Sequence, residues 1–453
     1  MSFWTIAWRN MQQRWLASSL TGLSMALGVA VMVCVIVIHS VAVKQFNQDA
    51  AGYHLIIGSG KGSKTDLVLS TVFHVGTPLF PIPYAYYRDF TDGPHADLTA
   101  VAIPYCLGDS YEANGRLYRV VGVTPDLFDK IQYGTDPDGT PRMYQFADGE
   151  NFKADRCFEA VVGSMVASQA GLNVGSTFNP THGISAEGDK HEPFKVVGVL
   201  EPTGTANDRA VFVNIEGFYL LAGHSLTKPH EGIETPPPPA ADAELKGVVA
   251  QPVLYDNDGN EVEPLAPELR EVTSVLVLCA NPFGSNALIY AINKDATRSA
   301  QAVAPGGVVT KLLEEIVGPV QVVLLVLTIM IVIVASISIL VSIYNSMSER
   351  SHDIAVMRAL GASRVAVMLI VLFESILLSV AGGLAGIALG HMIVGAAAPY
   401  VVEATGVRLA VWEFDPLELQ IIPALVVLAS LAGLIPAISA YRTDVARSLS
   451  GAR

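Results

Sequence analysis

Charged side chains are scarce in this sequence. Asp, Glu, Lys and Arg make up 15% of its 453 residues, whereas hydrophobic side chains make up 51%, and the mean hydropathy is +0.43. Soluble proteins carry about 25% charged residues. The deficit excludes a cytosolic enzyme and a nucleic-acid-binding protein, and it indicates a membrane protein.

Cysteine is scarce as well, with 4 residues. Cys34 lies in an apolar run, which leaves Cys106, Cys157 and Cys279 in a more polar part of the chain. Because three is an odd number, at most one disulfide can form there, and a fold stapled by several disulfides is excluded. A bridge between Cys106 and Cys157 stays open. Cys279 lies in an apolar, strand-like run and is expected to be a buried thiol.

The sequence also lacks a complete phosphate-binding loop. Residues 58–65 read GSGKGSKT, but Ser63 stands where the motif GxxxxGK[ST] requires glycine. Energy from ATP would therefore come from another chain.

No metal, cofactor or catalytic cluster is expected either. His182, His191 and Glu192 gather in a Gly-rich stretch, but two histidines nine positions apart match no zinc-ligand spacing. A polar surface loop is the favoured interpretation, and we expect a chain that is not itself an enzyme.

Four long apolar runs are present, at residues 16–43, 316–344, 365–397 and 421–441, and Glu374 is the one acid within them. A bilayer core needs about 20 residues of helix, so each run can span it. Four spans exclude a secondary transporter with many helices. They predict one large water-exposed domain, residues 44–315, and a short loop on the same side, residues 398–420.

The charges predict the orientation. Residues 44–315 hold 34 Asp and Glu against 19 Lys and Arg. The short segments at the other membrane face hold eight Arg against three acids. Because short basic loops stay in the cytoplasm, both termini, the loop 345–364 and the tail 442–453 are expected inside, and the large domain outside.

The segment before the first span, residues 1–15, has an aromatic stripe. Trp4, Trp8, Met11 and Trp15 recur at helical spacing, with polar residues between them. This favours an amphipathic helix in the cytoplasmic interface or a simple tryptophan-rich flank of the span. A cleaved signal peptide is disfavoured, since the uncharged core is too long.

The exterior domain is expected to be mixed α/β. Short alternating runs bounded by Gly, Pro, Asn or Asp predict strands, and helical patches lie between them. Predicted strands are residues 54–57, 117–123, 194–200, 210–213 and 273–279, and predicted helices are 163–170 and 286–293. Residues 133–142 and the Pro-rich residues 234–245 are expected to be linkers.

The most specific segment is the interior loop. Ser351 can cap a short helix, Ile354, Met357 and Leu360 follow at three-residue steps, and Gly361 supplies a stop. A short amphipathic helix exposed to the cytoplasm suits a groove on a partner protein. The alternative is that the helix folds back against the inner ends of the spans.

At these residues the chain resembles the FtsX-like ABC transporter permeases, the family of the macrolide exporter MacB and the lipoprotein-releasing LolC and LolE. The family pattern R-x-x-(E/D)-I-(A/G)-x-(M/L)-(R/K)-A-(L/I)-G-A is met by Arg350, Asp353, Ile354, Ala355, Met357, Arg358, Ala359, Leu360, Gly361 and Ala362. Further similarity lies in the early Ala7-Trp-Arg-Asn10, in the turns at 121–125 and 196–199, and in the Gly382-Gly383 pair. The resemblance covers essentially the whole chain. The absence of a fused ATPase domain is similar to the separate permeases LolC and LolE.

The resemblance implies a MacB-like exterior core domain and a mechanism called mechanotransmission in a bacterial inner membrane. A separate cytoplasmic ABC ATPase would bind the interior loop, and helices would relay its movement to the exterior domain. The residues implied for this coupling are Arg350, Asp353, Ile354, Met357, Arg358, Leu360 and Gly361. Implied partners are the ATPase, a second permease copy or paralogue, a periplasmic adaptor or carrier, and membrane lipids, with no nucleic acid.

Two functions of this family compete with each other. The favoured one is export, or release of a lipid or lipoprotein. The alternative is an FtsX-like signalling subunit that activates an exterior partner such as a cell-wall hydrolase. A membrane-anchored exterior enzyme is disfavoured, because no nucleophile and base are recognisable in the sequence.

Overall fold

The chain divides into two compact units in the computed structural model. We call the first the helical unit, which comprises Met1–Val43, Glu314–Ala404 and Arg408–Arg453, and the second the sheet unit, which comprises Lys44–Leu313 with Thr405–Val407. The structure describes residues 3–13, 15–49, 52–136, 138–183, 188–226, 253–281, 283–294, 299–312, 356–405, 414–416 and 418–442, and single positions between 315 and 341.

The sheet unit is built on an 11-stranded sheet. The order is β17-β1-β16-β3-β4-β12-β8-β11-β7, with β10 paired to β3 and β9 to β11. Most pairs are antiparallel, but β12 with β4 and β11 with β8 are parallel. The strands are β1 (Leu55–Ser59), β3 (Thr99–Ala113), β4 (Arg116–Val123), β7 (Phe146–Gly149), β8 (Glu159–Val162), β9 (Thr177–Phe178), β10 (Thr181–His182), β11 (Phe194–Leu200), β12 (Ala210–Asn214), β16 (Ser274–Cys279) and β17 (Ala300–Val303).

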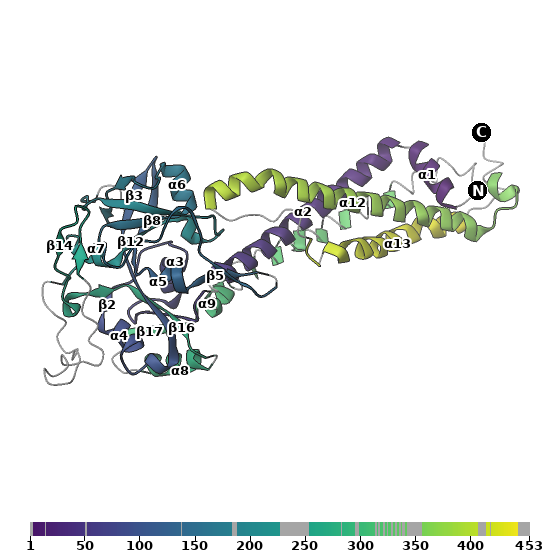
Figure 1. Ribbon diagram of the computed structural model, residues 1–453. Coiled ribbons are helices and arrows are strands. Elements are labelled where there is room, and N and C mark those ends of the chain that lie inside the picture. Colours follow the sequence, from purple (N-terminus) through teal and green to yellow (C-terminus); the bar gives the residue numbers. More distant parts are fainter. Residues whose placement is uncertain are drawn as a thin grey trace. The chain divides into compact units, whose positions relative to one another are not determined.

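Successive strand residues point to opposite faces of the sheet, so each strand supplies two hydrophobic cores. Leu55 and Ile57 belong to one core, and Ile56 between them belongs to the other. Helices cover both faces (Figure 1). The first core receives side chains from α4 (Ala85–Thr91), α6 (Ser164–Ala170), α7 (Ile215–Leu220) and α8 (Gly284–Asn293), and the second from α3 (Lys64–Val72), α5 (Asp126–Lys130) and α9 (Pro305–Leu312).

Smaller elements complete the sheet unit. Three two-stranded sheets pair β2 (Ile82–Pro83) with β15 (Glu271–Val272), β5 (Gln132–Thr135) with β6 (Pro141–Met143), and β13 (Leu254–Tyr255) with β14 (Glu261–Val262). The 3-10 helices are η1 (Ala96–Leu98), η2 (Ala206–Arg209) and η3 (Pro267–Leu269). The mixed α/β character agrees with the sequence-based expectation.

The local predictions hold for strands and fail for one linker. β1, β4, β11, β12 and β16 lie at the predicted strands, with ends that differ by at most two residues. Residues 133–142, predicted as a linker, instead form most of the β5–β6 hairpin, closed by an ion pair between Arg142 and Asp136 and a turn at Gly139. Asp, Gly and Pro are typical of linkers and also of the turns that close hairpins, and here they close a hairpin. The Pro-rich stretch 234–245 lies outside the described residues.

All four cysteines are free thiols. The bridge left open between Cys106 and Cys157 is therefore not formed in the structure. Cys279 is buried in the first core, as expected.

The helical unit contains α1 (Phe3–Gln13), α2 (Trp15–Asp49), α12 (Arg364–Thr405) and α13 (Glu418–Arg442). The three helices α2, α12 and α13 are drawn in Figure 1. Their apolar side chains, such as Val33, Val371 and Leu425, form one shared core. The Trp4 ring of α1 lies 4.7 Å from that of Phe373 on α12.

Two helices are long and apolar enough to cross a membrane by length and composition, over Ser18–Val41 and Arg364–Val402. A shorter apolar stretch occupies Glu418–Leu434 in α13. The expected second span, 316–344, is described only at single positions, so the count of four stays a prediction. α12 also continues to Thr405, past the expected end at residue 397, because its apolar sequence persists and Pro399 is tolerated within it.

Candidate functional site

The interior loop is described from residue 356 onward. Arg350, Asp353 and Ile354, which the sequence singled out, lie outside the described residues. Residues 356–359 are helical, and the amide N–H of Leu360 donates to the carbonyl of Val356. Gly361 ends the helix with a φ of +104°, a conformation that favours glycine.

The apolar residues of this helix divide into two environments. The Met357 side chain is half-buried and packs against the shared core of α2, α12 and α13. Leu360 is 84% exposed. The fold-back alternative therefore describes Met357, whereas Leu360 remains an exposed apolar side chain of the kind that partner proteins cover.

Buried polar groups connect the long helices. His391 of α12 lies 2.8 Å from the Glu418 carboxylate at the start of α13, and the Ser379 hydroxyl donates to the Leu425 carbonyl. Glu374, the acid predicted within a span, is buried in α12. These contacts agree with a helix-packing role for polar groups in this part of the chain.

In the incomplete phosphate-loop motif, residues 58–65, side chains of the chain itself fill the N-terminus of the following helix, α3. It joins β1 to α3, as a phosphate loop would, but Ser63 caps α3 by accepting from the Asp66 amide. The Asp66 carboxylate accepts from the Ser63 hydroxyl at 2.7 Å. An acid at this helix N-terminus holds the place where a phosphate would bind, so the geometry disfavours nucleotide binding here.

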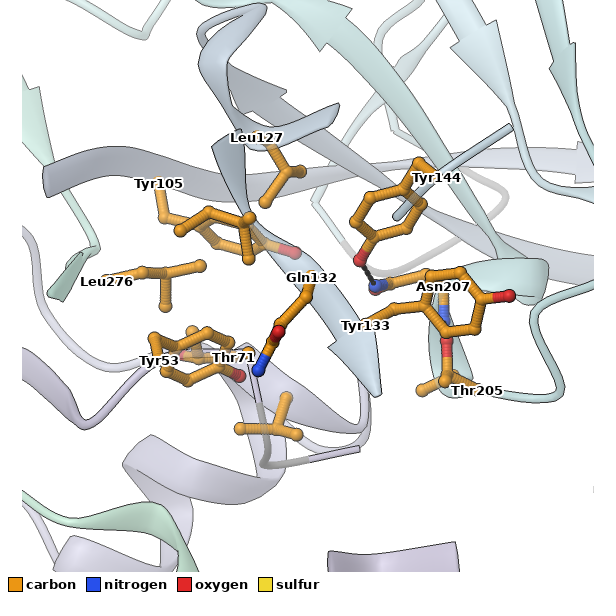
Figure 2. A pocket seen from close by; sticks show the side chains of 14 residues that line it. Tyr53, Thr71, Tyr105, Leu127, Gln132, Tyr133, Tyr144, Thr205, Asn207 and Leu276 are labelled. Carbon is orange, nitrogen blue, oxygen red and sulfur yellow. Dashed lines mark hydrogen bonds between the residues drawn. The ribbon is translucent and has the colours of Figure 1, made fainter. Parts of the chain in front are cut away.

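A tyrosine-lined cavity lies between η2 and the second core of the sheet unit. Figure 2 shows Tyr53, Tyr105, Tyr133 and Tyr144 around it. The Asn207 amide donates to the Tyr144 hydroxyl at 2.6 Å. The cavity volume of about 20 Å³ suits about one water molecule, which excludes it as a substrate site in this conformation.

The interpretation of His182 and His191 as parts of a polar surface loop is wrong for His191. Its side chain is only 5% exposed and lies with Asp109, His182 and His224 in one group. Burial, the largest effect, lowers the pKa of His191. The charge of Asp109 opposes this shift, and His224 and His182 add to it. Glu192 is exposed and is not part of the group.

The sequence could not group these four residues, because Asp109 and His224 stand far from the histidine pair along the chain. The only local signal was the His182 and His191 pair itself. A hairpin brings these two together without the spacing of a helical metal motif.

Comparisons with known proteins bear on both units. The family model described as MacB-like periplasmic core domain matches residues 18–246, and the one described as FtsX-like permease C-terminal matches residues 325–445. One similar solved structure is a domain of a protein described as a permease, from Porphyromonas gingivalis. It has 10% sequence identity, covers 57% of this chain and 90% of that chain, and has a TM-score of 0.27.

A search of the curated proteins finds no match. The MacB-like match alone spans about half of the chain, and the FtsX-like match covers the region of α12 and α13. By these two matches, the chain belongs to the family of FtsX-like ABC transporter permeases with a MacB-like periplasmic core domain.

Proposed function

We propose that this chain is the permease subunit that transmits the movement of a separate cytoplasmic ATPase to a task outside the membrane. Permeases of this family are inner-membrane proteins that work with a cytoplasmic ABC ATPase. The exterior task that we propose is export, or release of a lipid or lipoprotein, with a second permease subunit beside this one.

The observation that carries the proposal is the exposure of Leu360. It sits at the end of a short helix in which the Met357 side chain is already packed. Full burial by a partner of a large apolar side chain that is 84% exposed stabilises the complex by roughly 1.5–3 kcal/mol. A groove on an ATPase is such a partner.

The same segment is connected to a long rigid element. α12 begins at Arg364, just after the turn at Gly361, and runs for 42 residues. At 1.5 Å per residue this is a rod of about 60 Å, longer than the hydrocarbon core of a bilayer. A push on the loop would therefore displace the whole helix, and this is what mechanotransmission requires.

The test replaces the exposed leucine with a charge. Leu360→Glu places a carboxylate in the proposed groove, where burial of an unpaired charge costs at least about 1.4 kcal/mol. We expect the co-expressed ATPase to bind at least about tenfold more weakly in pull-down, with membrane insertion unchanged.

Phe283→Glu is the matched control, because Phe283 is 83% exposed but belongs to the sheet unit. It should leave ATPase binding unchanged. Full ATPase binding by a correctly inserted Leu360→Glu variant would refute the coupling role. Met357→Glu is less informative, since it would also disturb the core against which Met357 packs.

A further inference from the structure

Four potential metal ligands lie close together in the sheet unit, and they are remote in sequence from the interior loop, residues 345–364. Asp109 comes from β3, His182 from β10, His191 from the segment paired with β10, and His224 from the turn that follows α7. Each offers one ligand atom, and these atoms all lie within 4.8 Å of one another.

The separations fit a tetrahedral ion. With zinc–ligand bonds of about 2.0–2.1 Å, the ligand atoms of a tetrahedral site lie about 3.3 Å apart. Asp109 Oδ1 lies 3.0 Å from His224 Nε2 and 3.6 Å from His182 Nδ1. The other carboxylate oxygen, Asp109 Oδ2, lies 3.5 Å from His191 Nε2. The three rings also lie around a common centre, with centroids 5.0 to 5.5 Å apart.

Three of the four residues place buried polar atoms in this group that have no hydrogen bond among the residues that the structure describes. Both Asp109 carboxylate oxygens, His191 Nε2 and His224 Nε2 are buried, and none makes an aligned hydrogen bond. Asp109 is fully buried. Buried polar atoms without partners cost roughly 1–3 kcal/mol each, so simple ion pairing accounts poorly for four of them in one place. A cation at the centre would take the Asp109 carboxylate and both of these histidine nitrogens as ligands.

The backbone of β3 places Asp109 in this group. The pairing of β3 with β4 shifts register between Leu107 and Asp109, which makes a bulge at Gly108, and bulges commonly re-aim a side chain at a site. In the pairing of β10 with β3, His182 stands directly opposite Asp109.

We propose that Asp109, His182, His191 and His224 bind one divalent transition-metal ion, with Zn²⁺ as the best match. Imidazole nitrogens with one carboxylate in tetrahedral arrangement suit zinc, whereas Mg²⁺ and Ca²⁺ prefer sites made of oxygen atoms. His182 is 50% exposed and gives the ion a route to solvent. The bound ion would join β3, the β10 hairpin and the turn after α7.

The experiment uses the full chain in detergent, purified without a polyhistidine tag and stripped of metal. We expect it to bind one equivalent of Zn²⁺, and Zn²⁺ at about 100 times its dissociation constant to raise the unfolding temperature by roughly 5–10 °C. Co²⁺ in place of Zn²⁺ should give the visible absorption of a tetrahedral site.

Two variants test the ligands. Asp109→Asn and His224→Ala should each weaken Zn²⁺ binding by at least about 100-fold, because loss of a supporting residue outside the ligand shell already costs 10–100-fold. His95→Ala, a histidine of the same unit outside the group, should bind Zn²⁺ like the wild type.

Asp109→Asn is nearly isosteric and keeps the fold testable. Its unfolding temperature without metal should equal or exceed that of the wild type, since a buried unpaired carboxylate is removed. Failure of the wild type to bind Zn²⁺ would overturn the proposal. So would a folded Asp109→Asn variant that binds Zn²⁺ and Co²⁺ as tightly as the wild type does.

Discussion

His74 is a buried histidine that folding keeps neutral. It follows α3 with a φ of +56°, and its Nε2 lies 3.1 Å from Oδ1, the side-chain amide oxygen of Asn207. Burial lowers its pKa from 6.5 to about 4, the hydrogen bond to Asn207 opposes this shift, and the charges of Arg119 and Arg209 add to it. The unfolded chain therefore binds a proton at this residue before the folded chain does.

This difference predicts acid sensitivity of the sheet unit. Above pH 6.5 both states hold a neutral His74, so the stability is complete. As the pH falls from 6.5 towards 4, the unfolded state is protonated first and the free energy of unfolding decreases, by up to roughly 3 kcal/mol. Thermal unfolding of the full chain across this window should show the loss.

His74→Asn is the comparison, because asparagine tolerates a positive φ and does not titrate. The variant should lose less stability between pH 6.5 and 4 than the wild type does. Parallel pH profiles for the two proteins would mean that other groups cause the acid sensitivity.

Small residues set the distance between α2 and α12 within the helical unit. Gly382, Gly386 and Gly390 recur every four residues on α12 and face α2. A Cβ at Gly386 would come 2.5 Å from the Cβ of Val29, and one at Gly390 would come 2.8 Å from that of Val33. Close backbone approach of this kind is how membrane helices associate tightly.

A single added methyl group should therefore separate the two helices. Gly386→Ala should lower the free energy of unfolding in detergent by roughly 1–3 kcal/mol, the usual effect of overpacking. The measurement is thermal unfolding of the full chain. A mechanism that relies on α12 as a rod further predicts weaker stimulation of the ATPase by this variant.

Gly22→Ala is the control on the other helix. The substitution is chemically identical, but a Cβ at Gly22 meets no atom within 4 Å. Alanine should leave stability unchanged or raise it there, because it favours helix more than glycine does. If both variants behave alike, helix propensity and not the contact decides the effect.

At the scale of the whole molecule, the uneven charge distribution predicts which segments face the cytoplasm. A thiol introduced by Ala240→Cys should react with an impermeant reagent added to intact cells, and one introduced by Ser351→Cys should not. Reaction of the Ser351→Cys variant from outside would overturn the proposed orientation.

The native thiols should contribute little background to this labelling. Cys106, Cys157 and Cys279 are buried in the sheet unit. Burial raises the pKa of Cys106 to about 12 and that of Cys157 to about 11, so the reactive thiolate is rare at neutral pH. The unmodified protein measures whatever background remains.

The properties that the sequence determined by itself follow from local patterns. Apolar runs predicted the long helices α2 and α12, alternation predicted strands such as β4 and β11, and the motif around Gly361 indicated the permease family that the comparisons then showed. Each of these depends on residues close together in the chain, where spacing alone decides which side chains share a face.

The tertiary structure decided what depends on contacts between distant segments. It separated Met357, which packs against the shared core of the helical unit, from Leu360, which remains exposed, although both stood at equivalent steps of one pattern. It also brought Asp109 and His224 to the histidine pair. That meeting depends on a β-bulge, on the register of β10 against β3 and on the turn after α7, and packing of the whole sheet sets all three.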